Sequence, residues 1–276
     1  MPRLGTDVDR YLRRELLPTV WCPGCGNGSI AQALAMALDR LGREPEEVVV
    51  VGGIGCSGRT PFYMQTNALH TTHGRALAFA TGLKMAKPGL TVVVTSGDGD
   101  ALAIGGNHFI HAARRNLDVT LLLYNNAIYG MTGGQLAPTT LPGSRTTTSL
   151  LGSTENAFDT VALALAAGAT YVARTTSFDM QEMPLYIERA IQHPGFAVVE
   201  ILTQCPTYYG RLNRIGEAPE MLLWERDLTD PAPAAPDSVQ GWTGTLPTGE
   251  FRRDIRPEYT QQYRELVKAS GGMPRD

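Results

Sequence analysis

Short runs of consecutive apolar residues alternate along this chain with longer segments whose apolar residues recur at helical spacing. Unbroken apolar runs are typical of strands that are covered on both faces. The runs that we expect to be strands are residues 48–51, 91–95, 119–124, 170–173 and 197–202. The segments that we expect to be helices are residues 27–41, 74–87, 101–115, 156–167 and 179–193. This alternation predicts an α/β fold of three layers, in which helices cover both faces of a parallel sheet.

The composition changes after about Asp227. Residues 230–236 read Asp-Pro-Ala-Pro-Ala-Ala-Pro, which is typical of a semi-extended linker. The remainder, residues 238–276, is polar and has one helical candidate at 259–270. We therefore expect a cofactor-binding domain over residues 1–228 and a C-terminal linker and extended arm over residues 229–276. An arm that wraps a partner subunit and a disordered tail are both open at this point.

Charge and composition exclude several classes of function. Charged residues make up 18% of the 276 residues, below the usual level of roughly a quarter, which suggests that a partner chain covers part of the surface. The net charge is −3, and no basic run indicates a nucleic-acid partner. Residues 1–18 lack the apolar core of a signal peptide, and no stretch approaches the roughly 20 apolar residues of a membrane helix. We expect a soluble, cytoplasmic protein.

All four cysteines lie in predicted loops. Two occur in the run Cys-Pro-Gly-Cys-Gly at 22–26, Cys56 lies in the glycine-rich segment 52–58, and Cys205 precedes a proline. In the cytoplasm, cysteines serve as metal ligands or catalytic groups more often than as disulfides. Glycine lets backbone N–H groups approach the sulfurs of an iron–sulfur cluster, where such hydrogen bonds tune its potential. The pattern favours one [4Fe–4S] cluster.

Two other interpretations of the cysteines stay open. Buried apolar cysteines are common, but they would be expected inside strands and helices. Structural zinc sites usually contain two close pairs of ligands, whereas this chain has one pair and two distant single cysteines. The spacing favours the cluster, and a zinc-stabilised binding module without catalysis is the alternative from another functional class.

Two neighbouring strand ends carry oxygen ligands and glycines. The segment Thr-Ser-Gly-Asp-Gly-Asp at 95–100 follows a predicted strand and precedes a helix, where backbone N–H groups favour a phosphate. Asp98 offers a hard oxygen ligand to Mg²⁺, which commonly joins one or two protein oxygens to phosphates. Asn126 and the carbonyl of Ile128 follow the next strand. We expect a metal–diphosphate site at this edge of the sheet.

These motifs together resemble a known family. Gly97-Asp98-Gly99 followed by Asn125-Asn126 is similar to the thiamine diphosphate motif. With Cys-Pro-Gly-Cys-Gly at 22–26, Gly-Cys-Ser-Gly at 55–58, His-Thr-Thr-His-Gly-Arg at 70–75 and Thr-Gly-Gly-Gln at 132–135, residues 21–217 resemble the β subunits of 2-oxoacid:ferredoxin oxidoreductases. The run Cys-Pro-Thr-Tyr-Tyr-Gly-Arg at 205–211 resembles the 2-oxoglutarate branch most closely.

The resemblance implies a set of ligands for each cofactor. It implies that the chain has the fold of the diphosphate-binding half of a thiamine diphosphate enzyme. The ligands of the [4Fe–4S] cluster would be Cys22, Cys25, Cys56 and Cys205. The ligands of Mg²⁺ would be Asp98, Asn126 and the Ile128 carbonyl. The residues that contact thiamine diphosphate would be Ile54, Gly55, Cys56, Ser57, His73, Gly99, Asp100, Gly130 and Met131.

The resemblance also implies an activity and partners. Family enzymes convert a 2-oxoacid, coenzyme A and oxidised ferredoxin into acyl-CoA, CO₂ and reduced ferredoxin, or run the reverse carboxylation. The glutamate that activates the cofactor belongs to the α subunit, and this sequence shows no replacement for it near Asp98 or Asn126. We therefore expect no catalytic residue on this chain, no activity without an α subunit, and ferredoxin as the electron acceptor. A pyruvate-specific or broad 2-oxoacid enzyme, and a cluster-free thiamine decarboxylase or synthase, are the alternatives among enzymes.

Overall fold

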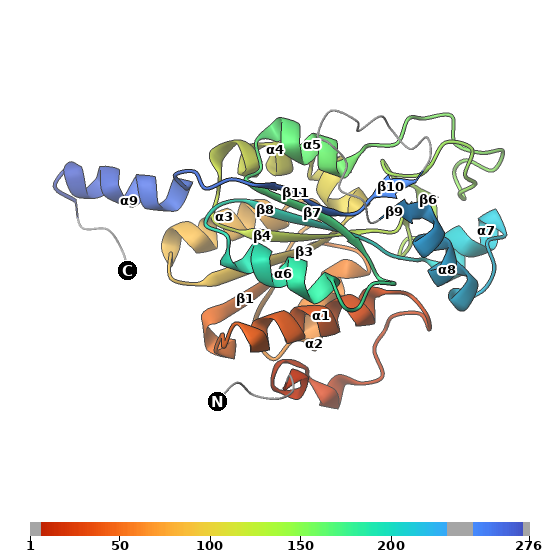
Figure 1. Cartoon of the computed structure of the whole chain (residues 1–276), viewed down its shortest axis with the longest axis horizontal. Helices are drawn as coiled ribbons and strands as arrows, with labels where there is room; N and C mark the ends of the chain where they lie inside the picture. The colour runs from red at the N-terminus through yellow and green to blue at the C-terminus, as the bar shows by residue number, and fades with distance from the viewer. Residues whose placement is uncertain (1–6, 231–244, 273–276) are drawn as a thin grey trace.

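A seven-stranded sheet with helices on both faces forms the centre of the protein (Figure 1). The structure is a computed structural model that describes residues 7–230 and 245–272. The strand order is β11-β7-β8-β4-β3-β1-β2. Every neighbouring pair is parallel except β11 and β7. The strands of this sheet are β1 Val48–Gly52, β2 Asn67–His70, β3 Thr91–Gly97, β4 Thr120–Asn125, β7 Tyr171–Thr176, β8 Ala197–Leu202 and β11 Gly249–Arg253.

The helices divide between the two faces of the sheet. The α-helices are α1 Asn27–Arg40, α2 Thr60–Tyr63, α3 Ala76–Ala86, α4 Gly106–Arg115, α5 Thr160–Ala167, α6 Met183–Gln192, α7 Arg211–Asn213, α8 Ala218–Leu228 and α9 Tyr259–Ala269. Two π-helices are η5 Gly99–Ile104 and η6 Pro206–Gly210, and four short 3₁₀ segments are η1 Val8–Tyr11, η2 Arg14–Leu16, η3 Pro45–Glu47 and η4 Ser57–Arg59. None of the helices in the described ranges combines the length and the apolar character needed to cross a membrane.

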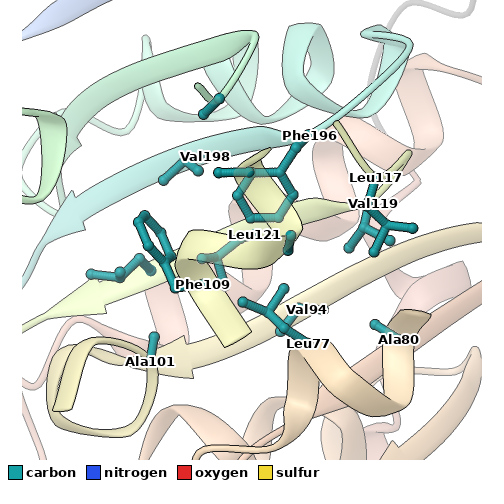
Figure 2. Close-up of a cluster of buried hydrophobic side chains, with 14 of the residues drawn as sticks. Leu77, Ala80, Val94, Ala101, Phe109, Leu117, Val119, Leu121, Phe196 and Val198 are labelled. Atoms are coloured by element: carbon teal, nitrogen blue, oxygen red, sulfur yellow. The ribbon is translucent and has the colours of Figure 1, made fainter. Parts of the chain in front are cut away.

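Two hydrophobic clusters lie on opposite faces of the sheet. On one face α3, α4 and α5 pack on the strands, and Leu77 and Phe109 lie against Val94 and Leu121 (Figure 2). On the other face α1 and α6 cover the alternate residues of the same strands. Because successive side chains of a strand point to opposite faces, the unbroken apolar runs fill both clusters. The predicted three-layer α/β fold is confirmed.

The helix after β3 is broken, contrary to the continuous helix expected over residues 101–115. It begins as the π-helix η5, and the N–H of Gly105 donates to the Asp100 carbonyl at 3.0 Å before α4 starts. A Cβ at residue 105 would lie 2.5 Å from that carbonyl oxygen, so glycine permits the wide turn. Single π-turns of this kind occur frequently at functional sites.

The helix predicted over residues 156–167 is shorter than expected. The helix α5 starts at Thr160, because the carboxylate of Asp159 accepts hydrogen bonds from the N–H groups of Val161 and Ala162, at 2.9 and 3.1 Å. Such an N-cap satisfies donors that the first helical turn leaves free, and it therefore fixes where the helix begins.

The C-terminal segment contributes to the sheet, whereas the series of strands was expected to end with β8. Strand β11 pairs antiparallel with β7 at the sheet edge, and Phe251 and Tyr259 pack against the core. The polar sequence of β11 gave no apolar run to detect. The predicted helix at 259–270 is observed as α9, which extends away from the sheet in Figure 1. The linker predicted at 230–236 lies outside the described residues from 231 onward.

Four small strands lie outside the main sheet. Within the main sheet, strand β2 was not predicted from the sequence. The small strands form two pairs, β5 Ile128–Tyr129 with β6 Gln135–Leu136 and β9 Thr229–Asp230 with β10 Leu246–Pro247. Strand β2 is largely exposed at the other edge of the sheet, so it carries no apolar run.

A buried chain of polar groups crosses the neighbouring strands β7, β8 and β4. Arg174 donates from Nε to Glu200 at 2.6 Å and from Nη2 to Asp159 at 2.8 Å. The other oxygen of Glu200 accepts a hydrogen bond from Asn125 at 2.8 Å. Burial alone would lower the pKa of Arg174, but Glu200 and Asp159 raise it above its usual value. The guanidinium is therefore charged and fully paired in the interior.

We predict that Glu200→Leu destabilises the fold by about 3–5 kcal/mol, because it leaves a buried guanidinium with one of its two acids. Chemical denaturation of the two proteins measures the difference. Asp227→Asn is the control, since its ion pair with Arg226 is exposed and is worth no more than about 1 kcal/mol. Equal effects of the two substitutions would contradict the importance of the buried chain.

Candidate functional site

One pocket lies at the carboxyl ends of β1, β3 and β4, where parallel α/β sheets bind their ligands. Its free space, counted together with the open mouth, is about 600 Å³. Its lining residues are Asn27, Ile54, Gly55, Cys56, Ser57, His73, Gly97, Asp98, Gly99, Asp100, Tyr124, Asn126, Ile128, Tyr129, Gly130, Met131 and Thr132.

The structure brings together every residue that was expected to contact the diphosphate cofactor or Mg²⁺. All nine expected cofactor contacts, from Ile54 to Met131, line this pocket, and so do Asp98, Asn126 and Ile128. Cys56 is the one expected cluster ligand that lines it. These residues come from four loops that are distant in the sequence.

Tyr129 lines the pocket and was not singled out from the sequence. Its hydroxyl donates to the Gly99 carbonyl at 3.1 Å, and a Cβ at residue 99 would lie 2.3 Å from its ring. Residue 99 therefore needs to be glycine, because a side chain there would collide with this ring. The sequence signal was available, since Tyr129 lies between Ile128 and Gly130.

The carboxylate of Asp100 accepts hydrogen bonds from several segments that surround the pocket. One of its oxygens accepts hydrogen bonds from Nδ1 of His73 at 2.5 Å, from the N–H of Gly74 at 2.7 Å and from the N–H of Ile54 at 3.2 Å. The other oxygen accepts a short hydrogen bond from the Ser96 hydroxyl. Because the protein itself supplies these donors, the side chain of Asp100 positions the loops that follow β1 and β2.

Asp98 presents a buried carboxylate at the start of η5. It is 3% exposed, and the Thr139 hydroxyl donates a short hydrogen bond to it. Burial raises the pKa of Asp98 to about 7. Among the described residues no basic side chain forms an ion pair with it. A cation bound in the pocket would stabilise its charged form.

The chain reverses direction after β4 through a left-handed residue. Ala127 has φ = +57°, which is unfavourable for a residue with a side chain. Two hydrogen bonds hold it, one from its N–H to the Asn125 side chain at 3.2 Å and one from the Thr140 hydroxyl to its carbonyl at 2.7 Å. This turn places Asn126 and Ile128 in the same pocket as Asp98.

Three segments that carry the cysteines are fastened to one another. The indole N–H of Trp21 donates to the Cys56 carbonyl at 2.8 Å, and the side chain of Gln204 donates a short hydrogen bond to the Gly24 carbonyl. A Cβ at Gly130 would lie 3.5 Å from the sulfur of Cys205 and 3.8 Å from that of Cys56. Two sulfurs that are 149 positions apart in the sequence therefore both lie close to the pocket residue Gly130.

The four thiols are free and influence one another electrostatically. Burial raises the pKa of Cys56 to about 11, and the sulfurs of Cys205, Cys25 and Cys22 raise it in the same direction. Burial also raises the pKa values of Cys25 and Cys205. Within the described residues, no three side chains of His, Cys, Asp or Glu converge as they would on a single metal ion.

Backbone N–H groups point at two of the four sulfurs. Hydrogen bonds from the N–H groups of Asn27 and Cys22 act to lower the pKa of Cys25 against the larger effect of burial. Those from Tyr208 and Tyr209, both in η6, act in the same way on Cys205. Hydrogen bonds of this type stabilise anionic sulfur.

A buried glutamate lines a pocket together with Asn126, whereas the sequence had indicated no glutamate near this residue. Glu225 of α8 lines a second, smaller pocket together with Asn126, and the Ser177 hydroxyl donates to it at 2.8 Å. Burial raises the pKa of Glu225 to about 8. It is not among the residues that line the larger pocket. Glu225 therefore does not take the place of an acid in that pocket.

Comparisons with known proteins identify close relatives. A family model described as "Thiamine pyrophosphate enzyme, C-terminal TPP binding domain" matches residues 53–201. The 2-oxoglutarate synthase subunit KorB of Archaeoglobus fulgidus is 49% identical over 93% of this chain and 92% of its own length. The KorB subunit of Methanocaldococcus jannaschii is 45% identical over 94% of this chain and 96% of its own length.

A solved structure is similar over almost the whole chain. It is described as 2-oxoglutarate:ferredoxin oxidoreductase from Magnetococcus marinus with 2-oxoglutarate, coenzyme A and succinyl-CoA bound. The two chains are 36% identical, with a TM-score of 0.87 over 96% of this chain and 91% of that one.

We predict opposite effects on stability for two glycine-to-alanine substitutions. A Cβ at Gly53 would lie 1.8 Å from the Asp100 carboxylate, so Gly53→Ala should destabilise the fold by about 1–3 kcal/mol. Gly82 in α3 has no neighbour within 4 Å of its Cβ position, so Gly82→Ala should stabilise the fold by about 0.5–1 kcal/mol. Denaturant unfolding of both variants measures the two signs. A harmless Gly53→Ala would contradict the central position of Asp100.

Proposed function

Since the chain belongs to the family of 2-oxoacid:ferredoxin oxidoreductase β subunits, we propose that it is the cofactor- and cluster-binding subunit of a 2-oxoglutarate:ferredoxin oxidoreductase. The reaction would convert 2-oxoglutarate, coenzyme A and oxidised ferredoxin into succinyl-CoA, CO₂ and reduced ferredoxin, or run in reverse. The choice of 2-oxoglutarate rests on the names of the relatives and on the ligands in the similar structure. Enzymes that use pyruvate or several 2-oxoacids are the alternative within the family.

One observation carries this proposal. Cys56 belongs to both parts of the site, because its loop lines the pocket while its sulfur and that of Cys205 both lie close to Gly130. An enzyme that removes electrons from a substrate on thiamine diphosphate needs an electron outlet close to the cofactor. A thiamine enzyme without a cluster would give the four grouped thiols no role.

The residues of the pocket fit thiamine diphosphate and Mg²⁺. Asp98, Asn126 and the Ile128 carbonyl would hold the ion, and these three oxygens match the hard ligands that Mg²⁺ prefers. When bound, thiamine diphosphate supplies an electron sink for the bond that breaks when a 2-oxoacid loses CO₂. A bound cation would offset the cost of the buried Asp98 charge, which the described residues leave without an ion-pair partner.

The remaining pocket residues orient the ligand. Because Nδ1 of His73 binds Asp100, its Nε2 atom is the ring nitrogen available to a diphosphate. Tyr129 supports the glycine at 99, and so it helps to keep the backbone N–H groups open to a phosphate. The acids that line the pocket are Asp98 and Asp100. Asp98 would bind the ion, and Asp100 already accepts hydrogen bonds from the surrounding loops. The acid that activates the cofactor would therefore come from an α subunit.

The cysteines fit a [4Fe–4S] cluster. Four free thiols with backbone N–H groups directed at two of them form the donor set that such clusters use. Cys22 is the most exposed of the four, and it would face the ferredoxin that accepts the electrons. Free thiols also favour a reducing, cytoplasmic compartment. A structural zinc site is the alternative that metal analysis separates.

We predict that Mg²⁺-dependent binding of thiamine diphosphate weakens about tenfold per pH unit below about pH 7, because a proton and the ion compete for the Asp98 carboxylate. The raised pKa of Asp98, about 7 without metal, sets this window. Calorimetric titration across the pH range, at one fixed Mg²⁺ concentration below saturation, measures it. Asp98→Asn should lose most of the affinity and the pH dependence, and a flat profile for the unsubstituted chain would refute the assignment.

We predict that Cys56→Ala loses the cluster, because four thiolates are needed and the sequence contains no spare cysteine. Anaerobic purification followed by iron and zinc analysis and visible absorption measures the loss. Ser57→Ala, which alters the neighbouring residue but no thiol, should keep its iron. Full iron content in Cys56→Ala would show the ligand set to be wrong, and zinc in place of iron in the wild type would refute the cluster.

We predict 2-oxoglutarate- and coenzyme-A-dependent dye reduction only when the chain is combined with its α subunit. Both preparations are supplied with thiamine diphosphate and Mg²⁺, and the initial rates are compared for the chain alone and for the complex. Pyruvate serves as the substrate control. Comparable turnover by the isolated chain would refute the proposal that the α subunit supplies the activating acid. A larger kcat/KM for pyruvate would refute the choice of 2-oxoglutarate as substrate.

A further inference from the structure

A long loop connects β6 to α5, and its stem holds the metal side of the pocket. We call residues 137–158 the connecting loop. The Thr139 hydroxyl donates to Asp98, and the Thr140 hydroxyl donates to the Ala127 carbonyl at 2.7 Å. Both threonines are buried. The loop is therefore anchored to Asp98, which lines the pocket, and to the turn at Ala127.

Hydrogen bonds within the connecting loop give it a defined shape. The N–H of Gly143 donates to the Ser153 carbonyl, and the N–H of Ser153 donates to the Ser144 carbonyl, each at 2.8 Å. The N–H of Thr147 donates to the Gly134 carbonyl at 2.8 Å. A segment of this length without regular secondary structure is unusual unless it has a function.

Further hydrogen bonds join the connecting loop to the segment that follows Cys205. The hydroxyls of Ser144 and Tyr209 lie 2.8 Å apart. The N–H of Arg145 donates to the Asn213 side chain at 2.7 Å, and that side chain donates back to the Arg145 carbonyl at 3.0 Å. The loop thus stands at the end of the sheet that also carries α7 and α8 (Figure 1).

The tip of this braced loop is apolar and exposed. Leu150 is 68% exposed and Leu151 is 99% exposed. Residues 137–158 contain only two charged residues, Arg145 and Glu155. A single exposed leucine needs no explanation, but two adjacent leucines on a nearly uncharged, hydrogen-bonded frame have the composition of an interface centre.

We propose that Leu150 and Leu151 insert into an apolar recess of the α subunit. This inference rests on the proposed function, because it takes as occupant the subunit that completes the cofactor pocket. The stem of the loop is hydrogen-bonded to Asp98, which lines that pocket. A chain that delivers an acid to the pocket would therefore approach the loop. Because hydrogen bonds already shape the frame, docking there orders few residues, which favours tight binding.

The test uses the full chain and its α subunit. Leu151→Asp should weaken the complex at least about tenfold, as expected for loss of a buried anchor. Isothermal titration of the α subunit with each variant measures the affinity. Ile110→Asp is the control, since Ile110 is 38% exposed on α4, outside both the connecting loop and the C-terminal arm. The control should bind within about twofold of the unsubstituted chain.

A second readout does not depend on a substitution. Amide hydrogen exchange over residues 141–153 should slow when the α subunit is added to the unsubstituted chain. If Leu151→Asp unfolds, Leu151→Ser and this exchange measurement decide the question. Wild-type affinity of the Leu151 variant, an equal loss in the control, absent protection, or protection by a second copy of this chain would each overturn the proposal. Dye reduction by the wild-type complex is measured separately, so a failure of the proposed function is recognised independently.

Discussion

The hydrogen bonds that converge on the Asp100 carboxylate fix the geometry on which the rest of the site depends. They join the backbone of Ile54 after β1, His73 and Gly74 after β2, and the Ser96 side chain in β3. A buried carboxylate requires such donors, and each donor restricts the loop that supplies it. The walls of the pocket are therefore in place before any ligand arrives, and preorganised groups of this kind cost little to align when it does.

A second polar system positions the opposite side of the pocket. The buried chain of polar groups ends at Asn125, whose side chain accepts a hydrogen bond from the N–H of Ala127 in the strained turn. The connecting loop donates a hydrogen bond to the carbonyl of the same residue. Hydrogen bonds have direction, so they can hold a residue in a left-handed conformation that apolar packing alone would not select. The strained residue Ala127 thus lies between two of the proposed metal ligands, and hydrogen bonds stabilise its conformation.

Much of the fold and of the site could be predicted, because both depend on local signals. Apolar runs marked β1, β3, β4 and β8, and glycine, aspartate and asparagine marked the ends of the strands. The polar edge strand β11 could not be predicted, because its position depends on pairing with β7. The positioning role of Asp100 was also missed, since its partners come from loops that only the folded sheet brings together.

The order of the strands has a consequence for how the protein matures. Strand β8 is the last parallel strand in the sequence, yet it inserts between β4 and β7, and Cys205 follows it. During synthesis the chain emerges from its N-terminus, so Cys22, Cys25 and Cys56 leave the ribosome well before the sheet can close. The four-thiol group exists only after that late insertion, so the proposed cluster could be loaded only once the chain has been synthesised past Cys205. Until then the early thiols need protection from oxidation and from competing metals.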